Sequence, residues 1–148
     1  LAVLLLNTAR VAIALGEPQE ALDLLARAKL AATLNDHFRA MVDVVESEAL
    51  TAAGRFEAAG AAARRAHRVF EEHGAQKQLG ITLCAEARAY AGLAKRRAAV
   101  SVIRGAIAVA ESFGSAYSLA QVYRASAEIT GNKLHAAHAA SIDSALHA

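Results

Sequence analysis

The side chains best suited to chemistry in this sequence are two histidines near its C-terminal end. His135 and His138 are three residues apart, so on a helix both imidazoles would share one face, where they could bind a single metal ion. No third ligand follows at a defined distance, although Asp143 and His147 come later, and no general-base glutamate lies between the two histidines. We therefore expect no metal site, and the role of these histidines stays open.

Other catalytic patterns are also missing from the sequence. Every glycine stands alone, so no glycine-rich loop could cradle a phosphate, and no serine occupies a nucleophile elbow. Cys84 is the only cysteine, which excludes an internal disulfide and favours a reducing, cytoplasmic compartment. Its helical context predicts a small buried apolar residue. We predict a protein that is not an enzyme and that needs no cofactor.

The charge of the chain is nearly balanced. Sixteen basic and 14 acidic residues leave a formal net charge of +2, which indicates neither a nucleic-acid partner nor a membrane surface. No uncharged stretch reaches the roughly 18 residues that a membrane span needs. Two basic groups have acidic neighbours and no interleaved aromatic residues for base stacking, so we interpret them as solvated helix faces. The groups are Arg64, Arg65, His67 and Arg68, and Lys95, Arg96, Arg97 and Arg104.

A regular return of glycine organises the chain. Single glycines among small and apolar residues recur at intervals of 38, 38 and 39 residues, at Gly16, Gly54, Gly92 and Gly131. Small residues follow each glycine at nearly constant distances, as close helix packing requires; they are Ala21, Ala59, Ala98 and Ala136, then Ala28, Ala66 and Gly105. Between the glycines lie further breaks at 34–37, 72–76 and 112–115. There, Asn35, Asp36 and Ser115 suit helix N-caps, and Gly74 and Gly114 suit left-handed helix ends.

These breaks divide the chain into eight predicted helices. No segment alternates with a period of two, so we predict no strand. The first helix is unusually apolar, whereas a terminal repeat should present a polar outer face. We therefore expect another repeat before Leu1, or else end-to-end self-association through Leu4 and Leu5. The predicted helices span residues 1–15, 18–33, 37–53, 56–72, 76–91, 94–112, 116–130 and 133–147.

A helical hairpin with a glycine turn and alanines at fixed offsets resembles the tetratricopeptide repeat (TPR). The series Gly16–Ala21–Leu25–Ala28 follows the TPR pattern well, as does its counterpart from Gly54, while the series from Gly92 contains one inserted residue. The series from Gly131 matches only in its first half. The period exceeds the classical 34 residues, and the signature tryptophan and repeat-end proline are absent. In this, the chain is similar to the MalT-like sensor superhelix and to repeats of large bacterial transcription regulators.

The resemblance implies an all-α, right-handed α-α superhelix, or solenoid, of about four TPR-like hairpins. Residues 1–148 would form one domain with repeats at roughly 1–35, 36–74, 75–114 and 115–148. The implied function is a protein-interaction or ligand-sensing module of a larger cytoplasmic bacterial protein, expected to be a transcription regulator. The alternatives are a self-associating scaffold and a repeat domain attached to a signalling enzyme.

In a TPR superhelix, the concave face carries the binding function. The family register would place Arg10, Glu48, Glu86 and Ala125 in one inward row, so that Glu48 and Glu86 stand side by side with Arg10 next to them. The expected partner is a peptide, a protein or a small effector, and solvated surface charge is the alternative interpretation. Tyr117 and Tyr123 could also line the face. The candidate binding residues are Arg10, Glu48, Glu86, Gln121 and Glu128.

Overall fold

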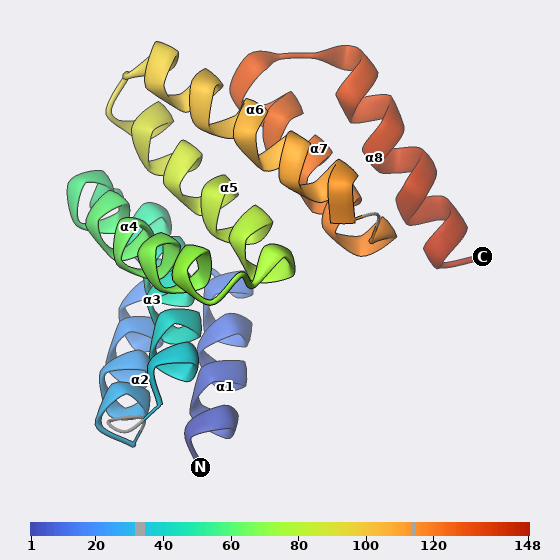
Figure 1. The fold of residues 1–148 in the computed structure, drawn as a ribbon. Helices are drawn as coiled ribbons and strands as arrows, with labels where there is room; N and C mark the ends of the chain where they lie inside the picture. The colour runs from blue at the N-terminus through green and yellow to red at the C-terminus, as the bar shows by residue number, and fades with distance from the viewer. Residues whose placement is uncertain (32–34, 114) are drawn as a thin grey trace.

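The protein is entirely helical in the part of the chain that the structure describes. The computed structural model describes residues 1–31, 35–113 and 115–148, which form eight helices and no strand (Figure 1). The predicted all-α class is confirmed, and the predicted helix ends that fall on described residues agree with the observed ones to within two residues; the predicted end at residue 33 lies outside the described residues. Ala32 to Leu34 and Gly114, a predicted helix end, lie outside the described residues. The helices are α1 (Ala2–Ala14), α2 (Pro18–Ala31), α3 (Asp36–Ala52), α4 (Phe56–Glu72), α5 (Gln76–Gly92), α6 (Arg96–Phe113), α7 (Ala116–Thr130) and α8 (Lys133–Leu146).

Consecutive helices form four hairpins that stack in chain order. The first helices of the hairpins contact one another, α1 with α3, α3 with α5 and α5 with α7. Helices α2, α4 and α6 each contact the first helix of their own hairpin and that of the next, and α8 contacts α7. Within the described residues, α2, α4, α6 and α8 do not contact one another. The first helices therefore make a continuous layer and the second helices an interrupted one, with α1–α2 and α7–α8 at opposite ends (Figure 1).

Side-chain caps and left-handed residues end the helices largely where the sequence predicts. The side chains of Asn35 and Ser115 accept hydrogen bonds from the first turns of α3 and α7. Gly16, Gly54, Gly74 and Gly131 all have positive φ angles, between 63° and 76°. In the third hairpin, however, α5 continues through Gly92, and Ala94 takes the left-handed conformation with φ 58°. An alanine in this conformation costs about 1 kcal/mol or more, since its Cβ crowds the backbone.

At position 92, glycine is needed for close packing and not for the geometry of the turn. A Cβ atom at this position would lie 2.2 Å from the ring of Phe56, the first residue of α4. The missing side chain therefore lets Phe56 rest directly on the end of α5. The turn follows two residues later than the glycine spacing predicts, so positions in α5 counted from Gly92 are displaced by two.

Small residues fill the space between the helices of each hairpin, but in the third hairpin they lie one position later than predicted. Ala98 is half-buried and Gly105 is exposed, so these two predictions are wrong; Ala99 and Ala106 are fully buried in their place. Ala136 is exposed as well, and α8 buries Ala139 instead. The small residues predicted for the first two hairpins, Ala21, Ala28, Ala59 and Ala66, are all fully buried.

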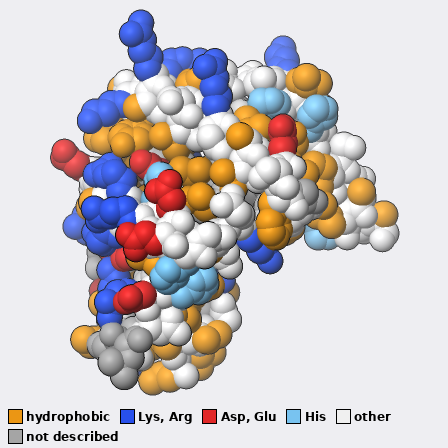
Figure 2. Space-filling view, viewed as in Figure 1, with side chains coloured by type: hydrophobic (Ala, Val, Ile, Leu, Met, Phe, Trp, Pro, Cys, Tyr) orange, Lys and Arg blue, Asp and Glu red, His pale blue; other side chains and the backbone are white. Residues whose placement is uncertain are grey.

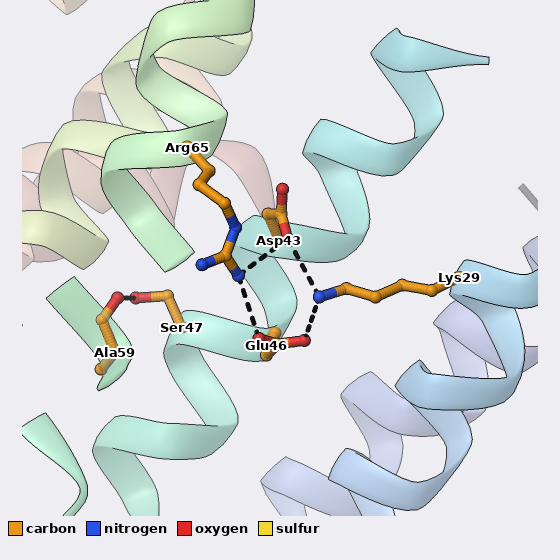
Figure 3. A network of polar contacts seen from close by, with 6 residues as sticks. All are labelled: Lys29, Asp43, Glu46, Ser47, Ala59 and Arg65. Atoms are coloured by element: carbon orange, nitrogen blue, oxygen red, sulfur yellow. Dashed lines mark hydrogen bonds and ion pairs between the residues drawn. The ribbon is translucent and has the colours of Figure 1, made fainter. Parts of the chain in front are cut away.

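A network of charges joins the first two hairpins (Figure 3). Asp43 of α3 is buried, and its Oδ1 lies 3.2 Å from Lys29 Nζ of α2 and 3.3 Å from Arg65 Nη2 of α4. The same two basic groups also contact Glu46, one helical turn further along α3. Nearby, Ser47 donates a buried hydrogen bond of 2.8 Å to the carbonyl of Ala59. A carboxylate can be buried here because two cations compensate it.

Candidate functional site

A groove with a volume of about 510 Å³ opens along the layer of first helices. Val44, Phe70 and Ile81 give it an apolar floor, while charged and amide side chains surround that floor. Helices from all four hairpins contribute to it, because neighbouring first helices are in contact. The lining residues are Arg10 of α1, Met41, Val44 and Glu48 of α3, Phe70 of α4, Lys77, Gln78 and Ile81 of α5, and Tyr117 and Gln121 of α7.

The structure brings three of the five candidate binding residues together in this groove. Arg10, Glu48 and Gln121 all line it, although they come from helices α1, α3 and α7. Tyr117 lines it too, one helical turn before Gln121. The spacing of the repeat therefore identified positions that are far apart in the chain and close in space.

Glu86 does not stand beside Glu48 in the groove. It is buried against α4, where its Oε2 lies 3.1 Å from Nδ1 of His67, and it lines a different cavity. The cause is the late turn at Ala94. Arg10 and Glu48 each precede the left-handed residue of their hairpin by six positions, and the residue six positions before Ala94 is Arg88.

Sequence reasoning did not identify Arg88 at this position. Its Nε donates a hydrogen bond of 3.2 Å to Oε2 of Glu128, the remaining candidate, which is not among the groove-lining residues. Arg10, Glu48 and Arg88 thus occupy equivalent positions in α1, α3 and α5 and alternate in charge. The equivalent residue of α7 is the buried Ala125, and Glu128 lies one helical turn later. The glycine spacing could not reveal this row, because Gly92 marks a packing contact and not the turn.

Glu48 is the electrostatically unusual member of the row. Burial raises the pKa of its carboxyl, and the nearby Arg88 and Arg10 partly oppose that shift. Glu48 receives no hydrogen bond or ion pair from the described part of the chain. A half-buried carboxylate that faces a cavity without a partner is stabilised by any ligand that supplies an N–H donor or a cation.

The single thiol takes no part in this site. Cys84 is buried in α5, as its sequence context predicts. Burial raises the pKa of Cys84 to about 12, and the positive charge of Arg88 opposes the shift only in part. The thiol is therefore protonated at neutral pH and is a poor nucleophile.

The basic group on α4 surrounds a second cavity of about 550 Å³. Glu71 and Glu86 line this cavity as well, and Arg65 is already paired with Asp43 and Glu46. Figure 2 shows blue and red side chains side by side over this part of the surface. The mixture of signs gives no uniform field for a polyanion, in agreement with the interpretation as a solvated face.

The two C-terminal histidines pack within the last hairpin. Nδ1 of His135 lies 2.7 Å from Oγ of Ser126, which is itself buried. The ring of Tyr123 lies 5.2 Å from that of His135 and 5.4 Å from that of His138. Among the described histidine, cysteine, aspartate and glutamate residues, no three are grouped so that they could hold a metal ion.

Leu4 and Leu5 of α1 were expected to form a surface for self-association, but only one of the two is exposed. Leu4 is exposed, whereas Leu5 is buried in the core shared with α2 and α3. A helical face alternates in this way because neighbouring residues point about 100° apart. Of these two residues, only Leu4 is available for a surface contact.

No helix in residues 1–31, 35–113 and 115–148 combines the length and apolar character that crossing a membrane requires. Comparisons with family models, with curated proteins and with solved structures give no match to this chain. The resemblance to tetratricopeptide repeats accordingly rests on the residues and their spacing.

Proposed function

We propose that this chain is a TPR-like interaction or sensing module that binds a peptide, a protein or a small effector in the groove, with its four hairpins in a right-handed superhelix. The observation that carries the proposal is the groove itself, which helices from all four hairpins line. An apolar floor with a few convergent polar groups is typical of ligand-binding cavities. A rigid layer of helices also holds these groups in place before a ligand arrives, which lowers the entropy lost on binding.

An elongated ligand fits the arrangement better than a compact one. Tyr117 and Gln121 line the groove and also a further cavity of about 510 Å³ between α7 and α8. Arg124, Asp143 and Leu146 lie in that second cavity. Because the two cavities share a wall, a peptide of several residues could cross from one to the other. This favours a peptide or a protein segment as the ligand.

The charges of the groove favour a ligand with a basic side chain next to an apolar one. Glu48 has no hydrogen-bond or ion-pair partner among the described residues and would pair with a lysine or arginine of the ligand. Val44 and Ile81 offer contact to an apolar neighbour of that residue, and Lys77 would accommodate an acidic residue. The partner we propose is therefore a mixed-charge peptide segment with a central basic residue.

We further propose that this recognition serves regulation and not catalysis. The buried, protonated thiol and the absence of a catalytic pattern in the sequence support a binding role without a cofactor. The similarity to repeats of bacterial transcription regulators supports a sensing arm of such a protein. Attachment to a signalling enzyme is the alternative within the same resemblance.

Selection from a random peptide library, followed by affinity measurement, tests the proposal. Peptides enriched on the wild-type protein should bind Tyr117→Ala at least about tenfold more weakly, because exposed tyrosines often dominate interface energies. Phe113→Ala is the matched control, since Phe113 is also an exposed aromatic residue but lines neither cavity. Equal losses in both variants, or a loss in neither, would show that the ligand does not bind in the groove.

A further inference from the structure

Two residues of the groove carry opposite charges without a direct partner in the described part of the chain. Arg10 and Glu48 each lie six residues before the left-handed residue of their hairpin, in α1 and α3, and both line the groove. Neither forms a hydrogen bond or an ion pair with a described residue. Burial raises the pKa of Glu48, and the positive charge of Arg10 is close enough to oppose that rise. A single ligand can therefore pair with both charges.

The packing of α1 against α3 sets the distance between these two charges. The two helices are in contact, and helices in contact lie about 8–10 Å apart from axis to axis. Both residues hold the same position relative to the turn of their hairpin, so we use this axial distance as the measure of their separation. A ligand that pairs with both must carry a basic and an acidic group about 8–10 Å apart on one of its sides.

A polyproline II segment places two side chains at this distance most directly. It has three residues per turn and a rise of about 3.1 Å, so residues three apart share a side at about 9 Å. In an extended strand, the residues that share a side are two or four apart, at about 7 or 13 Å. An α-helix needs about seven residues and, with its diameter of about 10 Å, would fill roughly 800 Å³. The groove has a volume of about 510 Å³.

The surroundings of the groove favour the same conformation. A strand needs a sheet edge to bond its backbone, and the described part of the chain contains helices only. The backbone of a polyproline II segment has no such need, because it stays solvated. Tyr117 is an exposed aromatic residue that lines the groove, and aromatic side chains are typical of grooves that bind such segments.

We propose that the groove binds a polyproline II segment in which an acidic residue lies three positions from a basic one. The basic residue pairs with Glu48 and the acidic residue pairs with Arg10, so the segment crosses from α3 to α1. Arg88 also lies near Glu48, but it is already bonded to Glu128 and does not compete for the acidic residue. This inference rests on the proposed function and specifies the ligand by its conformation and its charge spacing.

Binding of short proline-rich peptides tests the spacing. Each peptide carries one lysine and one glutamate in a frame of prolines, which holds the polyproline II conformation, and the two charges lie two, three or four positions apart in either order. Spacings of two and four turn the charges about 120° apart around the peptide. Fluorescence anisotropy at low ionic strength should therefore give about fivefold tighter binding at spacing three. A peptide with glutamine in place of glutamate should bind as weakly as the mismatched ones.

An exchange of charge between protein and peptide tests the role of Arg10. Arg10→Glu should lose the preference for glutamate and should prefer, by a similar factor, the spacing-three peptide with a second lysine in its place. Arg10 is exposed, so this variant should fold, which circular dichroism checks. Arg10→Gln replaces it if it does not, and should lose the preference without reversing it. Arg104→Glu is the matched control, because Arg104 is exposed on α6 and does not line the groove.

The outcomes separate this inference from the proposed function. Equal affinities at all three spacings overturn the inference, as does a preference for glutamate that survives in Arg10→Glu. Failure of every proline-rich peptide to bind also overturns it. In each of these cases, the proposed function stands if peptides selected from the random library bind the wild-type protein and lose affinity in Tyr117→Ala. If neither set of peptides binds, the proposed function and this inference both fall.

Discussion

At the scale of single residues, Glu48 connects the electrostatics of the groove to its proposed ligand. Its carboxyl is half-buried, has a raised pKa and lies between the positive charges of Arg10 and Arg88 without a direct partner. Folding therefore disfavours ionisation of Glu48 relative to the unfolded chain. A cationic ligand would oppose this shift by supplying a partner for the carboxylate.

The substitution Glu48→Gln should weaken the binding of a basic peptide roughly tenfold at neutral pH, because a hydrogen bond to a charged group is worth about 1.5–3 kcal/mol. Calorimetric titration measures the change. The exposed Glu57→Gln on α4 is the control, since Glu57 does not line the groove. Unchanged affinity in Glu48→Gln would exclude Glu48 as the recognition group.

The raised pKa of Glu48 should also make the stability of the protein depend on pH. Because the folded-state pKa of Glu48 is raised, folding favours its protonated form, so this group lowers stability as the pH rises through the interval between its ordinary and its raised pKa. Urea unfolding of Glu48→Gln should therefore show a gain in stability over the wild type at neutral pH and little difference below pH 4. A gain of equal size at both pH values would contradict this assignment.

Asp43 illustrates a different use of a buried carboxylate. It is buried between Lys29 and Arg65, and it joins three helices of the first two hairpins. Replacing it with alanine leaves both cations without this partner and should lower the unfolding free energy by about 2–4 kcal/mol. Asp36→Ala is a comparison at an exposed ion pair on the same helix and should cost less than about 1 kcal/mol. Similar losses for both substitutions in urea unfolding would mean that burial of Asp43 contributes nothing special.

At the scale of elements, the glycine at the end of α5 has a different role from the turn glycines at the ends of α1, α3 and α7. In the first two hairpins, a glycine provides the left-handed turn residue. In the third, Gly92 provides space for Phe56, and Ala94 takes the turn. The two roles respond in opposite ways to substitution and can be tested separately.

Gly92→Ala should destabilise the protein by about 1–3 kcal/mol, since its Cβ would overlap the ring of Phe56. In a Phe56→Ala background, the same substitution should cost much less, and a double-mutant cycle from thermal or urea unfolding measures the difference. If the cost of Gly92→Ala is the same in both backgrounds, the contact with Phe56 does not explain the glycine.

Ala94→Gly should stabilise the protein by up to about 1 kcal/mol, because glycine adopts the left-handed conformation without the steric penalty of a Cβ. Ala91→Gly, three residues earlier and inside α5, should instead destabilise it by about 1 kcal/mol. The two substitutions differ only in backbone conformation, so a shift of Tm in the same direction for both would refute the assignment of the turn to Ala94.

At the scale of the whole molecule, the sequence predicts the number of helices, their class and most of their ends. Glycines, caps and apolar stripes are local signals, and local signals determine where a helix begins and ends. The register between hairpins is harder to predict from the sequence, because it depends on contacts between residues that are distant along the chain. Because the third hairpin turns at Ala94 and not at Gly92, Arg88 and not Glu86 occupies the position equivalent to Glu48.

The layered arrangement of the helices has a mechanical consequence. Neighbouring first helices contact one another along the whole stack, whereas the described second helices make no contact with one another. Bending that compresses the first layer meets close-packed atoms, whereas bending that spreads it breaks a few contacts and finds free room on the other side. The stack is therefore an asymmetric spring, stiff in one direction and compliant in the other. A ligand that spans the groove from α1 to α7 would act on this spring at both ends, and it would turn occupancy into a change of distance between the two termini.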